Sequence, residues 1–213
     1  MPDISPEISA WIENIILPRY DAFDKGHQRD HARYVTDTAL ELSRYYDVDK
    51  DMIAVAAACH DLGLSADRQT HHLESGRIIR NLPELSKWFS AGQIETIAQA
   101  AEDHRASAKE PPRTIYGKII AEADRQIIPE VVIRRTIQFG FKHYPELSRE
   151  GHWKRTVEHL EEKYGDGGYL RLWIPESQNA SRLEELRCII RDKAALRSIF
   201  DRIFEEDQIF TQG

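Results

Sequence analysis

Four residues combine metal-ligating side chains with positions facing inward on apolar helices: His31, His60, Asp61 and Asp124. His60 and Asp61 directly follow the run Ala54–Cys59, whose small and apolar residues favour a buried helix. A buried imidazole beside a buried carboxylate needs a partner, because an unpaired buried charge is costly. A metal ion would satisfy both side chains at once, provided that other segments supply further ligands.

His31 and Asp124 are the candidates for those further ligands. His31 precedes Val35 by four residues in a helix expected at 28–46, so it lies on the inward stripe of that helix. Asp124 lies on the apolar stripe of a second helix, expected at 114–128. Because different helices of a bundle can bring inward side chains to one point, we expect the two residues to meet the His60–Asp61 pair.

Two imidazoles with two carboxylates form a mixed nitrogen and oxygen site. Such a site suits Mn, Fe, Co, Ni or Zn, whereas Mg and Ca prefer oxygen ligands, so Mg is the poorer match. Four protein ligands on an octahedral ion leave positions for water or substrate, as hydrolytic chemistry requires. The four residues therefore predict one divalent ion with open coordination positions.

Helical periodicity extends over most of the chain and predicts an all-α fold. Only residues 169–174 have the character of a strand, and the histidines at 143, 152 and 159 are expected at exposed helical positions. We expect a single domain over 1–213, with a core at about 26–128 and a helical extension at 129–213. The expected helices are 6–16, 28–46, 50–60, 71–82, 93–103, 114–128, 131–144, 145–164 and 180–206.

Composition restricts the partners and the location. The net charge of −7 argues against nucleic acid or a membrane surface as an electrostatic partner, although local basic patches remain compatible with it. Two cysteines cannot build a disulfide framework, which fits a reducing compartment. No signal peptide and no apolar membrane span is apparent, so we expect a cytoplasmic protein. We expect the long last helix to pack in the core of the chain, and formation of a homodimer is the second interpretation.

Two longer motifs surround the candidate ligands. Ala-Ala-Ala-Cys-His-Asp-Leu-Gly contains His60 and Asp61, and Ile-Ile-Ala-Glu-Ala-Asp-Arg contains Asp124. With His31 upstream, this order resembles the HD superfamily of metal-dependent phosphohydrolases over about residues 26–128. The resemblance implies an HD-domain-like helical bundle with additional C-terminal helices, and it implies that His31, His60, Asp61 and Asp124 are the metal ligands.

Two further histidines would extend this site. The segment His72-Leu-Glu-Ser-Gly76 is similar to the His-x-x-x-Gly segment of many binuclear HD proteins, and His104 stands where those proteins have another histidine. If both bind, the site holds two metal ions; otherwise they contact the substrate or the other ligands. His71 fits the segment less well, because the spacing to Gly76 selects His72. Leu64 replaces a lysine found in many binuclear relatives, and no Gly-Tyr-Pro segment is present, so the likeness does not extend to the cyclic-dinucleotide branch.

The resemblance implies hydrolysis of a phosphate ester of a small molecule, with nucleotides as one class of substrate. The metal-bound water would attack phosphorus, Asp61 would orient that water, and His104 would act as acid or base. Arg68 and Arg105 are the best candidates to hold phosphate oxygens.

Two other functions compete with this interpretation. A few HD relatives are di-iron oxygenases, which would require His72 and His104 as ligands of a second ion. A metal-bound sensor or binding module without turnover is the third interpretation, and the complete four-residue ligand set argues against it.

Overall fold

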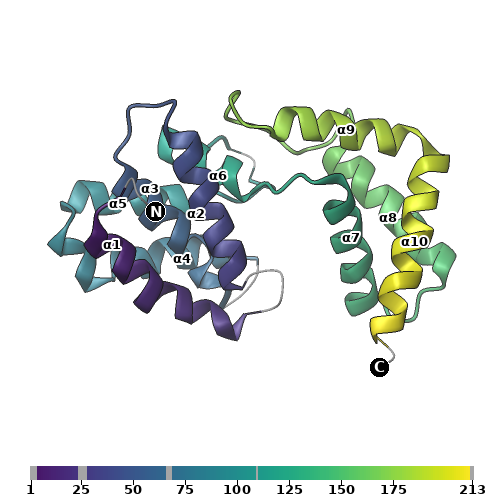
Figure 1. Cartoon of the computed structure of the whole chain (residues 1–213), viewed down its shortest axis with the longest axis horizontal. Helices are drawn as coiled ribbons and strands as arrows, with labels where there is room; N and C mark the ends of the chain where they lie inside the picture. Colours follow the sequence, from purple (N-terminus) through teal and green to yellow (C-terminus); the bar gives the residue numbers. More distant parts are fainter. Residues whose placement is uncertain (1–3, 24–27, 66–68, 109, 212–213) are drawn as a thin grey trace. The chain divides into compact units, whose positions relative to one another are not determined.

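The computed structural model describes residues 4–23, 28–65, 69–108 and 110–211, and this part of the chain is all-α, which confirms the predicted fold class (Figure 1). Helices, short 3-10 turns and irregular segments alternate, with no strand among the described residues. None of the helices within these ranges combines the length and apolar character needed to cross a membrane.

The chain divides into two compact units. Unit 1 contains Met1–Arg125 and Trp173–Ser177, and unit 2 contains Gln126–Leu172 and Gln178–Gly213. The first boundary lies close to the expected end of the core at residue 128. The sequence did not predict that Trp173–Ser177 returns to unit 1.

Unit 1 is built around one buried helix, α3 (Lys50–Cys59), in which every residue from Met52 to Cys59 is buried. The Asp49 side chain caps its first turn by accepting hydrogen bonds from two main-chain N–H groups. At its other end, the buried Tyr20 hydroxyl donates to the carbonyl of Ala58 over 2.7 Å. α3 packs against α2, α5 and α6 (Figure 1). The other elements are α1 (Pro6–Trp11), a π-helical turn (Ile12–Ile16), α2 (Arg29–Ser43), α4 (His71–Arg80), α5 (Ala91–Glu102), α6 (Ile115–Asp124) and 3-10 turns at Leu17–Ala22, Leu62–Ser65 and Pro83–Lys87.

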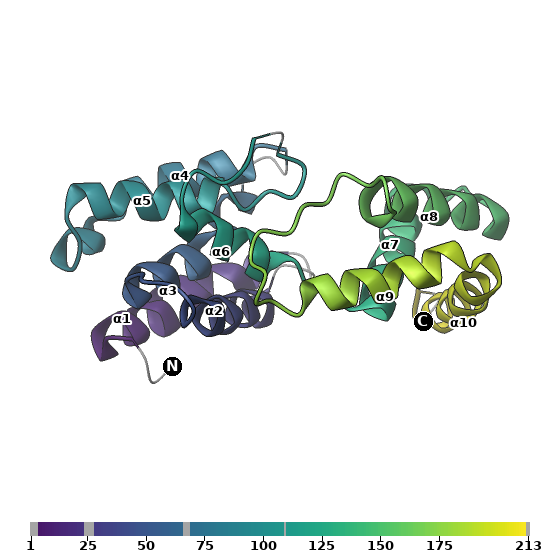
Figure 2. The same ribbon diagram turned by 90° about the horizontal axis from the view of Figure 1, so that it is seen from above.

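Unit 2 is a set of four helices: α7 (Pro129–His143), α8 (Arg149–Tyr164), α9 (Asn179–Arg191) and α10 (Lys193–Thr211). The expected single helix at 180–206 is broken, and the chain turns sharply between α9 and α10 (Figures 1 and 2). Asp192 explains the break, because its carboxylate accepts hydrogen bonds from the N–H groups of Ala194 and Ala195 and so caps a new helix.

Three local expectations differ from the structure. α6 ends at Asp124 rather than at residue 128: Arg125 leaves the helical conformation, with φ −79° and ψ 78°, and Ile128 is extended before Pro129. Residues 169–174 are irregular and make no strand. Two histidines are less exposed than expected: His152 is buried, since its ring packs between Phe141 and Phe204 in the core of unit 2, and His159 is partly buried.

Acid should weaken unit 2 through His159. Burial lowers the pKa of His159 from 6.5 to about 4, and the nearby Lys163 and Arg155 lower it further. The unfolded chain therefore takes up this proton first as the pH falls below 6.5. The contribution of His159 to the free energy of unfolding should fall with pH down to about 4 and then level off. Chemical denaturation of the metal-free chain at pH 7 and pH 5 measures how much free energy of unfolding is lost on acidification. His159→Gln should lose less than wild type, by on the order of 1 kcal/mol after allowance for partial exposure. Equal losses of unfolding free energy in the two proteins would contradict this role of His159.

Candidate metal centre

The candidate ligands lie at the ends of five helices of unit 1. His31 is in the first turn of α2, and His71 is the first residue of α4. His60 and Asp61 follow the end of α3, His104 follows the end of α5, and Asp124 is the last residue of α6. Helix ends are where the chain leaves a regular element, so a side chain there can point into the space between neighbouring helices.

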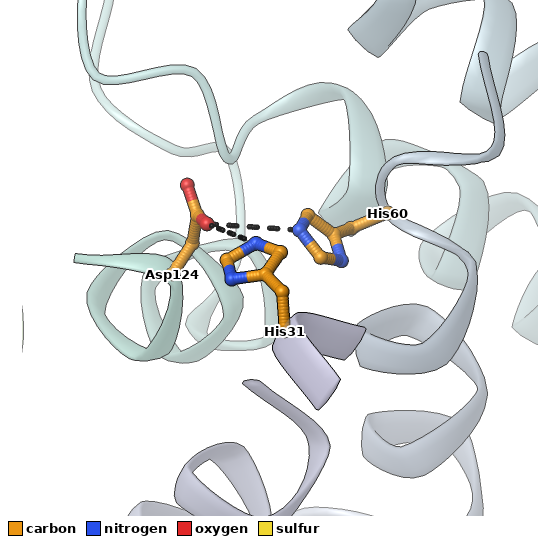
Figure 3. A group of neighbouring side chains, drawn as sticks. All are labelled: His31, His60 and Asp124. Carbon is orange, nitrogen blue, oxygen red and sulfur yellow. Dashed lines mark ion pairs between the residues drawn. The ribbon is translucent and has the colours of Figure 1, made fainter. Parts of the chain in front are cut away.

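His31, His60 and Asp124 form a first group (Figure 3). Oδ1 of Asp124 lies 3.2 Å from Nε2 of His31 and 3.6 Å from Nε2 of His60. Oδ2 of Asp61 faces the same two nitrogens, at 3.7 Å from His31 and 3.2 Å from His60. The structure thus brings together the four residues that the sequence singled out, from α2, from the turn after α3 and from the end of α6.

Asp61, His71 and His104 form a second group. Oδ1 of Asp61 lies 3.4 Å from Nε2 of His71 and 3.5 Å from Nε2 of His104. The two Nε2 atoms are 3.1 Å apart. Asp61 therefore belongs to both groups, with one carboxylate oxygen directed to each.

The hydrogen bonds of two histidines fit metal ligation. Nδ1 of His60 lies 2.7 Å from the carbonyl oxygen of Ala57, and Nδ1 of His104 contacts the carbonyl of Ala101. Because a carbonyl only accepts, each Nδ1 carries the proton, and each Nε2 presents a lone pair to the cluster when the ring is neutral. Nε2 of His60 is buried and faces carboxylate oxygens of Asp61 and Asp124 without a well-aligned hydrogen bond to either. A lone pair facing a carboxylate calls for a cation between them, so the donor set fits a divalent ion.

Neighbouring charges shift the pKa values of the side chains in the cluster. Burial alone would lower the pKa of His60, but Asp61 and Asp124 raise it well above its usual value. Burial alone would raise the pKa of Asp61, but His60, His104 and His71 lower it well below its usual range. For Asp124 the effect of burial is likewise outweighed, and His31 and His60 lower its pKa. Both carboxylates are therefore ionised at neutral pH and available as ligands.

The cluster is not equally accessible from all sides. The His60 side chain is fully buried and that of Asp61 is 4% exposed, whereas that of Asp124 is 25% exposed and that of His71 is 13% exposed. Asp124 and His71 are therefore the most exposed side chains of the two groups.

Gly63 brings α4 close enough to place His71. A Cβ atom at Gly63 would lie 2.0 Å from the carbonyl oxygen of His71 and 2.7 Å from the amide nitrogen of Ser75. Instead, the Gly63 N–H donates to Oγ of Ser75 over 2.9 Å. The Leu62–Ser65 turn after Asp61 can thus contact the start of α4.

The structure differs from the sequence expectation at the His71–His72 pair. His71, not His72, directs Nε2 at Asp61. Successive helical residues point about 100° apart, so only one of the two can face the cluster. His71 lies on the same face of α4 as the buried Ser75 and Ile79. The sequence does not reveal which face is buried, because Ile78 and Ile79 are equally apolar.

His72 and the two candidate arginines lie outside the two groups or outside the described residues. Burial first, and then the neighbouring His104 and Arg105, lower the pKa of His72 to about 4, so its ring is neutral. Nη1 of Arg105 donates to the carbonyl of Gln69, just before α4, and not to a ligand of the cluster. Arg68 lies outside the described residues.

The comparisons with known proteins agree with this geometry. Residues 29–126 match the HD domain family, which confirms the resemblance seen in the sequence. The crystal structure of a predicted HD superfamily hydrolase from an uncultured Thermotogales bacterium is similar in fold, with a TM-score of 0.50 and 23% sequence identity. The likeness covers 71% of this chain and 87% of that protein. No protein with a curated description matches the chain at a significant level.

The shared position of Asp61 predicts unequal effects of two matched substitutions. Asp61→Asn removes the charge that faces both groups, so we expect both ions to be lost. Asp124→Asn removes a ligand of the first group alone, so the ion of the second group should remain. Each lost ligand should weaken the affected ion by more than the roughly 10- to 100-fold typical of residues that only support ligands. Calorimetric titration with Mn²⁺ and metal analysis after dialysis measure both effects.

His72→Gln is the matched control, because the side chain lies next to a proposed ligand and outside both groups. This variant should bind Mn²⁺ as wild type does, whereas His71→Gln should lose the second ion. Loss of an ion in His72→Gln, with full binding in His71→Gln, would reverse the assignment of these neighbours.

Proposed function

Because residues 29–126 match the HD domain family, we propose that this chain is a metal-dependent phosphohydrolase that cleaves a phosphate ester of a small molecule. The observation that carries the proposal is the Asp61 carboxylate, which lies between two groups of imidazole ligands. Nucleotides are the first class of substrate to test.

The proposed cofactor is a divalent transition metal, and the donor set favours Mn, Fe, Co, Ni or Zn over Mg. His31, His60, Asp61 and Asp124 would hold one ion, and Asp61, His71 and His104 would hold a second. A divalent ion in such a site lowers the pKa of bound water and polarises a phosphoryl oxygen.

The residues of the cluster divide the remaining work. Asp61 is ionised and almost fully buried, so its carboxylate can orient a water molecule lying between the two groups. Both ring nitrogens of His104 face atoms of the cluster or its own helix, so we assign His104 to ligation rather than to proton transfer. Asp124 and His71 are partly exposed, so we propose that a phosphate group would approach the cluster next to these side chains.

Arg105 directly follows the proposed ligand His104 in the sequence. Its guanidinium anchors Gln69 at the start of α4, and its charge contributes to the low pKa of His72. We propose that Arg105 both fixes the loop before His71 and supplies positive charge that attracts a phosphate group.

A di-iron oxygenase is the second candidate function. The observation that favours it is the second group, because a carboxylate shared between two histidine-containing groups also suits a pair of iron ions. Consumption of O₂ by iron-loaded chain in the presence of an organic substrate, without release of phosphate, would support this function over hydrolysis.

A screen of phosphate esters tests the proposed hydrolysis. Metal-free chain should be inactive, and addition of Mn²⁺, Co²⁺, Ni²⁺ or Fe²⁺ should produce phosphate or nucleoside release from at least one nucleotide or sugar phosphate. Asp61→Asn should reduce that rate by at least about 100-fold, since the metal-activated water depends on it.

If stoichiometric metal is bound and no ester of the panel is cleaved, while iron-loaded chain consumes no O₂, the chain is a metal-bound binding module.

A further inference from the structure

A short segment of the chain returns to unit 1 after α8 and lies against the helix that carries Asp124. This segment, Trp173–Ser177, is named the strap below. Ile174 is 2% exposed and joins the core of unit 1, and Trp173 packs against that core. The Tyr46 hydroxyl donates to the Glu176 carboxylate over 2.6 Å at the other end of the strap.

Glu122 is the main polar anchor of the strap. Its side chain is fully buried. Oε2 accepts hydrogen bonds from the main-chain N–H groups of Trp173, at 2.7 Å, and Ile174, at 3.4 Å. Oε1 accepts from the Ser177 hydroxyl at 2.5 Å. A buried carboxylate is costly unless it is hydrogen-bonded, so these three donors of the strap stabilise the Glu122 side chain in its buried position.

Glu122 is also part of the turn that holds Asp124. Asp124 is the last residue of α6, and the chain leaves the helix at Arg125. The Arg125 N–H closes this final turn by donating to the carbonyl of Glu122 over 3.2 Å. The last turn of a helix frays readily unless outside contacts fix it. One residue therefore joins the strap, through its side chain, to the helix end that presents a proposed metal ligand.

We propose that Glu122, held by the strap, is a positioning residue for Asp124 and so for the ion of the first group. The inference rests on the proposed metal-dependent function. The buried carboxylate locks the final turn of α6, and this fixes the direction of the Asp124 side chain toward Nε2 of His31 and His60. Residues that orient metal ligands in this way typically change metal affinity about 10- to 100-fold when they are replaced.

The position of the strap in the chain adds a consequence. The residues that precede and follow it, Leu172 and Gln178, belong to unit 2. Unit 2 is thus continuous in sequence with both ends of the segment that anchors Glu122, and the ion of the first group depends on a segment far outside the HD domain match at 29–126.

Mn²⁺ titration of the full chain tests the proposal without relying on turnover. His31→Ala first identifies the binding step that belongs to the first group. Glu122→Ala should weaken that step by about 10- to 100-fold and leave the step of the second group within about threefold of wild type. Glu122→Gln should recover most of the affinity, because its amide keeps a carbonyl acceptor and can pair with the Ser177 hydroxyl. A general loss of structure would weaken both steps together, so the selectivity separates positioning from stability.

Two variants on the strap side complete the experiment. Ser177→Ala removes one donor to Glu122 and should weaken the same step by a smaller factor, and it provides the test if Glu122→Ala fails to fold. Tyr46→Phe removes the strap hydrogen bond that does not involve Glu122 and should bind Mn²⁺ as wild type does. If Glu122→Ala and Ser177→Ala bind the first ion as wild type does, the positioning role of Glu122 is overturned and the proposed function still stands. Absence of Mn²⁺ binding by the wild-type chain would instead overturn the proposed function.

Discussion

The structure of unit 1 depends on one buried carboxylate that must face imidazoles on both sides. Asp61 is 4% exposed, and its two oxygens are directed to different pairs of histidines. A carboxylate in such a place is stable only with positive charge close by, supplied by protons on the imidazoles or by metal ions. The burial of α3, the Tyr20 bond to Ala58 and the close approach allowed by Gly63 all act to keep this residue and its neighbours in place.

The proposed ligands all lie at helix ends, and helix ends need contacts from outside the helix. The turn after α3 is held by the hydrogen bond of His60 to Ala57, and the turn after α5 by that of His104 to Ala101. The end of α6 is held differently, because Glu122 takes its partners from the strap. The geometry of the candidate metal centre therefore depends both on the helical core and on a segment that begins 51 residues after Glu122.

Much of the fold and of the site follows from the sequence, for physical reasons that are specific to certain residues. A polar residue on an otherwise apolar helical stripe is a strong signal, and it predicted that His31, His60, Asp61 and Asp124 would meet. The choice between His71 and His72 depends on the rotation of one short helix, which adjacent histidines do not reveal. The break at Asp192 was missed because an acidic residue on an exposed helical face and an N-cap look alike until the backbone is known. The strap was missed because hydrogen bonds from main-chain N–H groups to Glu122 leave no side-chain pattern.

The most direct test of the account is a crystal structure of the Mn²⁺-loaded chain with anomalous scattering data collected to locate the metal. Two metal sites that share Asp61 should give one anomalous peak among His31, His60, Asp61 and Asp124, and a second among Asp61, His71 and His104. A metal peak elsewhere, or no peak at the first group in a chain that binds stoichiometric Mn²⁺, would contradict it.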